Sequence, residues 1–192
     1  MWKATLFLSF CILASAQEKF QLRGECAEPL SLGEETCDGN TTSSIRWYMD
    51  KDTLTCLAFK YTGCGGNKNN FDTKDHCQRK CIPMDFHTCP ANTDPVRRAD
   101  NTTHCQTNVP VPLECPPGSV CKMGFAVGIC CDAKLSDKVN ANYKPDCGPT
   151  KKFYKSEQFG FQLIHLGKSC SHNFCPENAV CHEGAYFAYC CV

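Results

Sequence analysis

The sequence predicts a chain of small disulfide-rich modules: an α+β unit with a two-stranded hairpin and a C-terminal helix, followed by two short β-rich cysteine-stapled repeats. Three observations predict this class. The chain has 19 cysteines in 192 residues, so disulfides rather than one large core are expected to hold it. Aromatic and β-branched stretches flank a polar turn between residues 45 and 61. A Cys-Pro-x3-Val-Cys-x2-Gly pattern with a closing Cys-Cys occurs twice.

Residues 1–16 have the pattern of a secretory signal peptide. Lys3 precedes an apolar core from Leu6 to Leu13, and Ala14-Ser15-Ala16 matches the small-x-small sequence before a signal-peptidase cut. The mature chain is expected to be secreted and to begin at Gln17, with residues 17–25 as an N-terminal extension. No other apolar run approaches the roughly 20 residues that span a bilayer, so no membrane insertion is expected.

The first module is predicted over residues 26–81. Ile45 to Met49 and Thr55 to Tyr61 are rich in aromatic and β-branched residues, which favours a twisted hairpin. Thr73 can then cap a short helix whose last turns carry two cysteines on one face. Charged residues in its first and last turns suit the helix dipole, namely Asp75, Arg79 and Lys80.

The six cysteines of this module leave gaps of 10, 18, 7, 12 and 3 residues. Aromatic and glycine landmarks fill the last three gaps: Arg46-Trp47-Tyr48, Cys56 to Cys64, Asn67 to Phe71, and Cys77-x-x-x-Cys81. This order resembles the Kunitz (BPTI-type) inhibitor domain over about 56 of the 192 residues. The resemblance implies the pairs Cys26–Cys81, Cys37–Cys64 and Cys56–Cys77, whereas the sequence alone leaves 15 pairings open.

The Kunitz resemblance also implies a contact loop and a partner, an extracellular serine protease. In that family the residue after the second cysteine enters the primary specificity pocket of the protease. The loop here comprises Thr36, Cys37, Asp38, Gly39 and Asn40, with Asp38 at the pocket position. A carboxylate would meet like charge in a trypsin-like pocket and lose its water in an apolar one. We therefore expect inhibition that is weakened or redirected to a protease with a basic pocket.

Three departures from the family affect the same loop. The gap before Cys37 is two residues longer than the usual eight, and the stretch from Cys37 to Arg46 is three residues longer. Glu35 and Thr62 replace the usual glycines and are expected to perturb the backbone. Asn40-Thr41-Thr42 is an N-glycosylation acceptor on the face that a protease would cover. Asn101 begins a second acceptor sequence, on a surface loop.

Two copies of one module are predicted at residues 89–131 and 147–191, after linkers at 82–88 and 132–146. Each copy has six cysteines and can close its own bridges; adjacent cysteines rarely bond, which leaves 12 pairings open in each. The segments before each Cys-Cys are predicted to be hairpins that turn near Gly124 and Gly184. The cysteines are Cys89, Cys105, Cys115, Cys121, Cys130 and Cys131, then Cys147, Cys170, Cys175, Cys181, Cys190 and Cys191.

The repeat pattern resembles the lustrin-type cysteine-rich repeat, which occurs with Kunitz domains in secreted nematode proteins, some of them cuticle-associated. The first copy fits better, because Cys89-Pro90 opens it as in the family. Modules of this size bury little apolar surface, so their bridges are expected to serve as scaffold. The polar, proline-containing linkers favour semi-independent beads.

Several function classes lack their signatures in this sequence. There is no Gly-x-Ser-x-Gly elbow and no Gly-rich phosphate loop, and His182-Glu183 lacks the second histidine of a zinc protease, so the chain is not expected to be an enzyme. Short zinc knuckles are absent, so no metal or cofactor is expected. The dibasic pair Arg97-Arg98 is interpreted as a solvated loop rather than a processing site.

The charge balance bears on partners. The formal net charge is zero and falls to −1 when Lys3 leaves with the signal peptide, so neither nucleic acid nor an anionic membrane is predicted as a partner. Three function hypotheses follow: a serine protease inhibitor, a structural protein of the extracellular matrix or cuticle that binds matrix proteins, and a channel- or receptor-directed ligand. A slightly acidic chain of three modules fits the third least.

Overall fold

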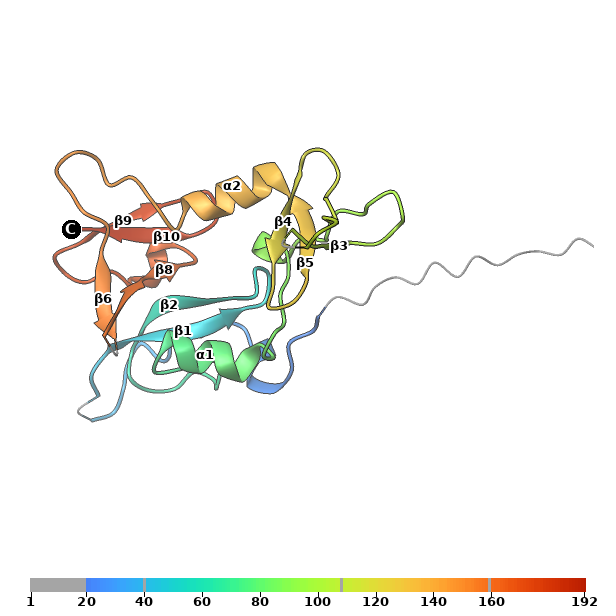
Figure 1. Cartoon of the computed structure of the whole chain (residues 1–192). Helices are drawn as coiled ribbons and strands as arrows, with labels where there is room; N and C mark the ends of the chain where they lie inside the picture. The colour runs from blue at the N-terminus through green and yellow to red at the C-terminus, as the bar shows by residue number, and fades with distance from the viewer. Residues whose placement is uncertain (1–19, 40, 108, 159) are drawn as a thin grey trace, which may run out of the picture.

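The computed structural model of the chain describes residues 20–39, 41–107, 109–158 and 160–192. The predicted signal peptide, the cut before Gln17 and the glycosylation candidate Asn40 lie outside the described residues. The rest forms small antiparallel sheets, short helices and nine disulfides, which confirms the predicted fold class (Figure 1). We call residues 26–81 the N-terminal unit, 89–131 the first repeat and 147–191 the second repeat. In the described ranges, no helix combines the length and apolar character that crossing a membrane requires.

The N-terminal unit contains the predicted hairpin and helix. Strand β1 (Ser44–Asp50) pairs antiparallel with β2 (Thr55–Tyr61), after a short 3-10 turn, η1 (Gly24–Ala27). Helix α1 (Lys74–Cys81) begins where predicted, because the Thr73 hydroxyl accepts a hydrogen bond from the His76 amide at 3.0 Å. The disulfides Cys26–Cys81, Cys37–Cys64 and Cys56–Cys77 close the unit, and these are the pairs that the resemblance implies.

The two repeats share one topology. The first contains β3 (His104–Cys105), β4 (Ser119–Met123) and β5 (Gly128–Asp132) in the order β3-β5-β4. The second contains β8 (Leu166–Gly167), β9 (Val180–Glu183) and β10 (Ala188–Cys191) in the order β8-β10-β9. The predicted turns are confirmed: the amides of Gly124 and Gly184 each donate, at 3.0 Å, to the carbonyl three residues later. Short 3-10 turns lie at η2 (Pro90–Asn92) and η3 (Cys170–His172).

The repeats also share their disulfide pattern, which the sequence left open. In both, the first cysteine pairs with the sixth, the second with the fourth and the third with the fifth. The pairs are Cys89–Cys131, Cys105–Cys121 and Cys115–Cys130, then Cys147–Cys191, Cys170–Cys181 and Cys175–Cys190. The second repeat adds a hairpin, β6 (Lys155–Gln158) with β7 (Phe161–Ile164), in its longer gap before Cys170.

The segment 132–146, predicted to be a linker, contains helix α2 (Ala133–Ala141). Asp132 caps it, since its Oδ1 accepts a hydrogen bond from the Leu135 amide at 2.7 Å. Leu135 and Val139, four residues apart, lie on one helix face and pack into a shared core. The polar composition of the segment reflects a helix with one buried face rather than a free tether.

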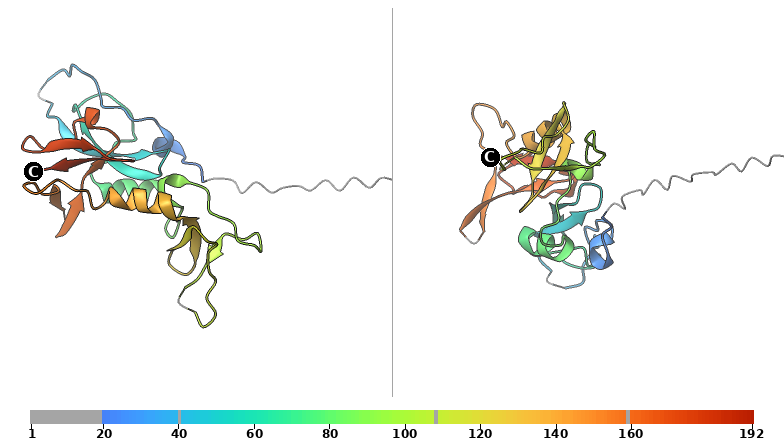
Figure 2. Two further views of the ribbon diagram at one scale, coloured as in Figure 1. Left: turned by 90° about the horizontal axis from the view of Figure 1, so that it is seen from above. Right: turned by 45° about the vertical axis from the view of Figure 1, so that its right-hand side comes forward.

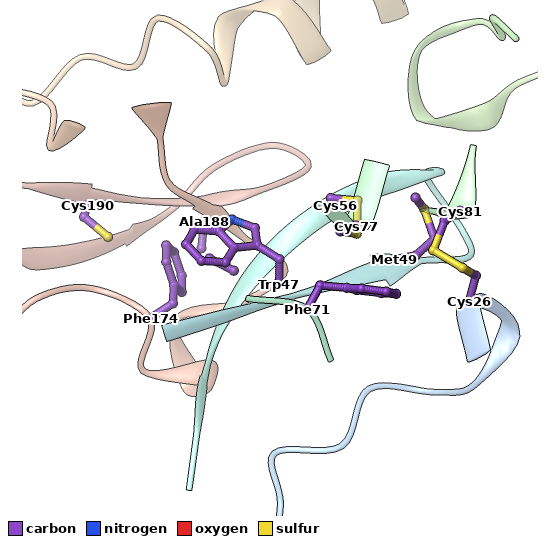
Figure 3. Packing of buried hydrophobic residues seen from close by; sticks show 11 residues of the cluster. Cys26, Trp47, Met49, Cys56, Phe71, Cys77, Cys81, Phe174, Ala188 and Cys190 are labelled. Atoms are coloured by element: carbon purple, nitrogen blue, oxygen red, sulfur yellow. A yellow bond between two sulfur atoms is a disulfide. The ribbon is translucent and has the colours of Figure 1, made fainter. Parts of the chain in front are cut away.

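The expectation of semi-independent beads is wrong for the second repeat, which packs on both faces of the β1–β2 hairpin. On one face, Trp47 lies in a cluster with Phe174 and Ala188 (Figure 3). On the other, Tyr48, Leu57 and Phe59 of the hairpin lie in a cluster with Leu166 and Phe187 of the second repeat and Val139 of α2. Figure 1 shows the strands of the second repeat lying along this hairpin. Burial of these apolar side chains stabilises the packed arrangement over separate beads.

An ion pair at the tip of the hairpin joins the same two modules. The Asp50 carboxylate is buried and accepts hydrogen bonds from the Thr53 hydroxyl at 2.6 Å and from Lys168 Nζ at 3.0 Å. Because Asp50 has partners from both modules, its charge is compensated only while the second repeat is docked.

Candidate functional site

The predicted contact loop projects from one end of the N-terminal unit (Figures 1 and 2). The segment that leads into the loop, residues 32–36, is held to the segment after β2 by two backbone hydrogen bonds. The Glu34 amide donates to the Cys64 carbonyl at 3.0 Å, and the Thr62 amide donates to the Leu32 carbonyl at 2.9 Å. The disulfide Cys37–Cys64 closes the base between the same two segments. The loop is therefore held from both sides while its tip points to solvent.

Glycines make room for the side chains that depart from the family pattern. Gly33 has φ +96°, and a Cβ there would lie 2.1 Å from Thr62 Oγ1. The Thr62 side chain thus occupies space that the missing side chain of Gly33 leaves. The backbone perturbation predicted for Thr62 is accommodated at Gly33, in the segment that leads into the loop. Gly63 has φ +112°, and a Cβ there would lie 3.1 Å from both the Thr41 Cβ and the Thr42 carbonyl oxygen. The absence of a side chain at Gly63 therefore leaves room for the segment at Thr41 and Thr42. Sequence reasoning assigned no role to Gly33 or Gly63; the available signals were a glycine four residues before Cys37 and a glycine directly before Cys64.

The tip presents a carboxylate followed by a glycine. Thr36, Asp38 and Gly39 are exposed and Cys37 is half-buried. Gly39 has φ +89°, a conformation that L side chains rarely adopt, and its carbonyl accepts a hydrogen bond from the Thr41 amide at 3.0 Å. Glu34 and Glu35 are exposed on the limb that leads to the tip. The loop therefore offers acidic side chains to a partner.

Residues of β1 and β2 support the segment after β2 that carries Cys64. Arg46 forms an ion pair with Asp72 and lies over the Tyr61 ring, with its guanidinium carbon 5.9 Å from the ring centroid. The Tyr61 hydroxyl donates to the Gly65 carbonyl at 2.8 Å. These contacts fix the segment that carries Cys64, so the loop geometry rests on the strands rather than on the disulfide alone.

The structure places the other sequence candidates away from this loop. Asn101 is exposed in a turn, as the second glycosylation prediction requires of a surface site. In the same turn the Arg98 amide donates to the Thr102 carbonyl at 2.8 Å and Arg97 Nη1 donates to the Asn101 carbonyl at 2.9 Å. The dibasic pair is therefore held in a folded turn.

One group of sulfur atoms has the spacing of a metal site. The Sγ atoms of Cys105, Cys115 and Cys121 lie within 4.8 Å of one another. All three are in disulfides, and a disulfide sulfur is not the thiolate that metals require. The group is a packed pair of bridges rather than a set of ligands.

Comparisons with known proteins agree with the first module and extend beyond it. The Kunitz/Bovine pancreatic trypsin inhibitor domain matches residues 25–82. A BPTI/Kunitz inhibitor domain-containing protein of Caenorhabditis elegans is 37% identical over 166 residues, covering 86% of this chain and 88% of the relative. The major allergen Ani s 1 of Anisakis simplex is 35% identical over 170 residues, covering 88% and 87%.

A third relative matches a shorter part of the chain. The Kunitz-type serine protease inhibitor Hg1 of Hoffmannihadrurus gertschi is 44% identical over 59 residues, which cover 31% of this chain and 61% of that protein. The search of solved structures gave no significant match. The similarity to the two nematode proteins therefore extends over the cysteine-rich repeats, whereas the match to inhibitor Hg1 has about the length of the N-terminal unit.

Proposed function

Because the chain belongs to the BPTI/Kunitz inhibitor domain-containing proteins, we propose that it is a secreted Kunitz-type serine protease inhibitor that Asp38 directs to an enzyme with a basic specificity pocket. The observation that carries the proposal is the exposure of Asp38 and Gly39 at the tip of a segment closed by Cys37–Cys64. A loop already held in one conformation loses little entropy on binding. The nine disulfides among the described residues are consistent with an oxidising, extracellular setting.

The charge of Asp38 decides which enzymes fit. A buried carboxylate without a partner costs several kcal/mol, and each 1.4 kcal/mol is about a factor of ten in affinity. A lysine or arginine in the pocket would compensate the carboxylate by a charge-assisted hydrogen bond. The exposed Glu34 and Glu35 add a negative rim that would speed encounter with a basic enzyme surface.

The test is progress-curve inhibition by the refolded Gln17–Val192 protein. The enzymes are trypsin, chymotrypsin, elastase and a serine protease that cleaves after acidic residues, each assayed with and without the Asn40 glycan. We expect inhibition of the last enzyme only, a loss of that inhibition in Asp38→Ala, and weaker binding of the glycosylated form. Persistent binding by Asp38→Ala would remove Asp38 from the proposed role. If neither the glycosylated nor the unglycosylated form inhibited any of the four enzymes, the inhibitor function would be rejected.

A second candidate function is favoured by a separate observation. The turn of the first repeat exposes Phe125 at 94%, and Val111, Met123 and Val127 of the same repeat are also exposed. Exposed apolar residues grouped in one module are typical of association surfaces. A structural protein associated with extracellular matrix or cuticle would use them. Co-fractionation with insoluble matrix tests this candidate, and a freely soluble monomer in native secretions would count against it.

A further inference from the structure

A concave site outside the contact loop lies beside the last turn of α1. A cavity of about 590 Å³ is bounded by the N-terminal extension, the C-terminal turn of α1 and the start of the segment that follows it. Its walls include Phe20 and Arg23 from the extension, Arg79 and Lys80 from the helix, and Ile82 and Pro83. Cavities of this volume are within the usual range for small-molecule sites.

The charged side chains that line the cavity are all cationic. Of the described residues that line it, Arg23, Arg79 and Lys80 are cationic and none is acidic. Arg79 pairs with Asp75 at 2.6 Å and Lys80 pairs with Glu25 at 3.3 Å. A guanidinium has five N–H donors and an ammonium three, so each side chain keeps donors for a ligand while its ion pair limits its movement.

The lining of the cavity also includes apolar side chains. The ring of Phe20 packs against Phe86, with 4.4 Å between the ring centroids. This contact fixes the extension against the segment that follows α1, so the cavity has two walls rather than one. Phe20, Ile82 and Pro83 offer a surface on which the less polar face of a sugar ring can lie.

We propose that this cavity binds a sulfated oligosaccharide. Arginine matches the planar, multi-oxygen geometry of sulfate and phosphate by bidentate hydrogen bonds. The apolar lining residues favour a sulfated sugar over a free oxyanion, which would contact only the cationic side chains. The chain carries no excess of positive charge overall, so binding depends on this local arrangement rather than on a general attraction.

The cavity and the contact loop lie at different ends of the N-terminal unit. The cavity is built around Cys26 and Cys81, whereas the loop is built around Cys37 and Cys64, and Figure 1 shows η1 and the projecting loop on opposite sides of α1. An oligosaccharide can therefore occupy the cavity while the loop is engaged. The proposal does not depend on protease inhibition, and its test is a binding measurement.

The experiment measures binding of a heparin-derived hexasaccharide to the refolded Gln17–Val192 protein by titration calorimetry at low and physiological ionic strength. The pocket variant is Arg23→Gln/Arg79→Gln/Lys80→Gln. The matched control, Lys134→Gln/Lys138→Gln/Lys144→Gln, removes the same charge from exposed positions in and after α2. We expect the pocket variant to lose at least tenfold in affinity and the control to stay within twofold of the wild type.

Two further measurements test whether the cavity recognises the sugar ring as well as the anionic groups: one uses a variant of an apolar lining residue, and the other uses control ligands. Phe20→Ala, which leaves every charge in place, is expected to weaken the hexasaccharide several-fold without changing the response to inorganic phosphate. Inorganic phosphate and a desulfated hexasaccharide are expected to bind far more weakly than the sulfated probe. Equal losses in the pocket and control variants, or equal affinity for phosphate and hexasaccharide, would overturn the proposal.

Discussion

At the scale of single residues, the choice of protease depends on Asp38, because the surrounding loop is held independently of that side chain. Exchanging the carboxylate for a guanidinium in Asp38→Arg removes the repulsion from a trypsin-like pocket and supplies the cation that such a pocket binds. We expect inhibition of trypsin to improve by at least about a thousandfold, roughly 4 kcal/mol. The inhibition constant for trypsin measures this.

The neighbouring Glu35→Arg is the control for Asp38→Arg. It makes the same charge change on the exposed limb of the loop, outside the pocket position, and is expected to change trypsin inhibition by less than tenfold. If Asp38→Arg, with its disulfides correctly formed, gained nothing, the longer loop rather than the carboxylate would be the obstacle.

His165 makes stability depend on pH. The residue is 6% exposed and lies between Trp47 and Tyr154, with its Nε2 atom 2.6 Å from the Ser156 hydroxyl. Burial, with a smaller contribution from the charge of Lys74, lowers the pKa of His165 from 6.5 to about 4. Between pH 6.5 and about 4, His165 is therefore protonated more readily in the unfolded chain than in the folded one. The resulting stability is present above pH 6.5 and is lost as the pH falls through about 4.

We expect the free energy of unfolding to fall by an amount on the order of 3 kcal/mol over this window. Denaturant unfolding at a series of pH values measures it. The variant His165→Gln should show a shallower dependence, and His104→Gln, which alters an exposed ring, should keep the wild-type slope. An unchanged slope in His165→Gln would assign the pH dependence to other groups.

At the scale of elements, the two repeats use the same turn in different ways. Counting from the Cys-Cys pairs, Phe187 of the second repeat corresponds to Val127 of the first. Phe187 is 1% exposed and packs against the β1–β2 hairpin, and its amide donates to Asn142 Oδ1 at 3.2 Å. In the first repeat the turn faces solvent. Equal backbone geometry thus serves docking in one copy and an exposed surface in the other.

A pair of substitutions tests this difference. Phe187→Ala should lower the free energy of unfolding by about 3–5 kcal/mol, because it leaves a cavity between two modules. Phe125→Ala should change it by no more than about 0.5 kcal/mol, because the ring is already in water. Denaturant unfolding of both variants measures the contrast. Similar effects of the two substitutions would contradict the docking of the second repeat.

The elements were predictable from the sequence where local chemistry decides them. The hairpin, the cap at Thr73 and the turns at Gly124 and Gly184 follow from side-chain type and spacing. The pairing of the repeat cysteines did not, because spacing alone cannot say which sulfurs the chain brings together. Asp132 and the Leu135–Val139 spacing signalled helix α2, but the polar composition of the segment and Pro145 indicated a linker instead.

At the scale of the whole molecule, the N-terminal unit and the second repeat share their buried surface. A module of about 55 residues buries little apolar area alone, and here the hairpin gains cover on both faces from Phe174, Leu166 and Phe187. The sequence could not reveal this docking, because each apolar residue also fits a core within its own repeat. The first repeat has its own small cluster of Cys89, Ile129 and Cys131.

Shared burial predicts shared unfolding of the N-terminal unit and the second repeat. Phe174 is fully buried in the cluster with Trp47 (Figure 3), so Phe174→Ala should lower the hydrogen-exchange protection of β1 and β2 amides as much as that of β10 amides. Val180→Ala, at an exposed position of the same repeat, should leave both unchanged. Amides of the first repeat, such as that of Cys130, which donates to the Thr103 carbonyl at 2.9 Å, should lose less protection. Loss confined to the second repeat would mean that the two modules unfold separately, and that the hairpin derives its stability from the three disulfides of its own unit.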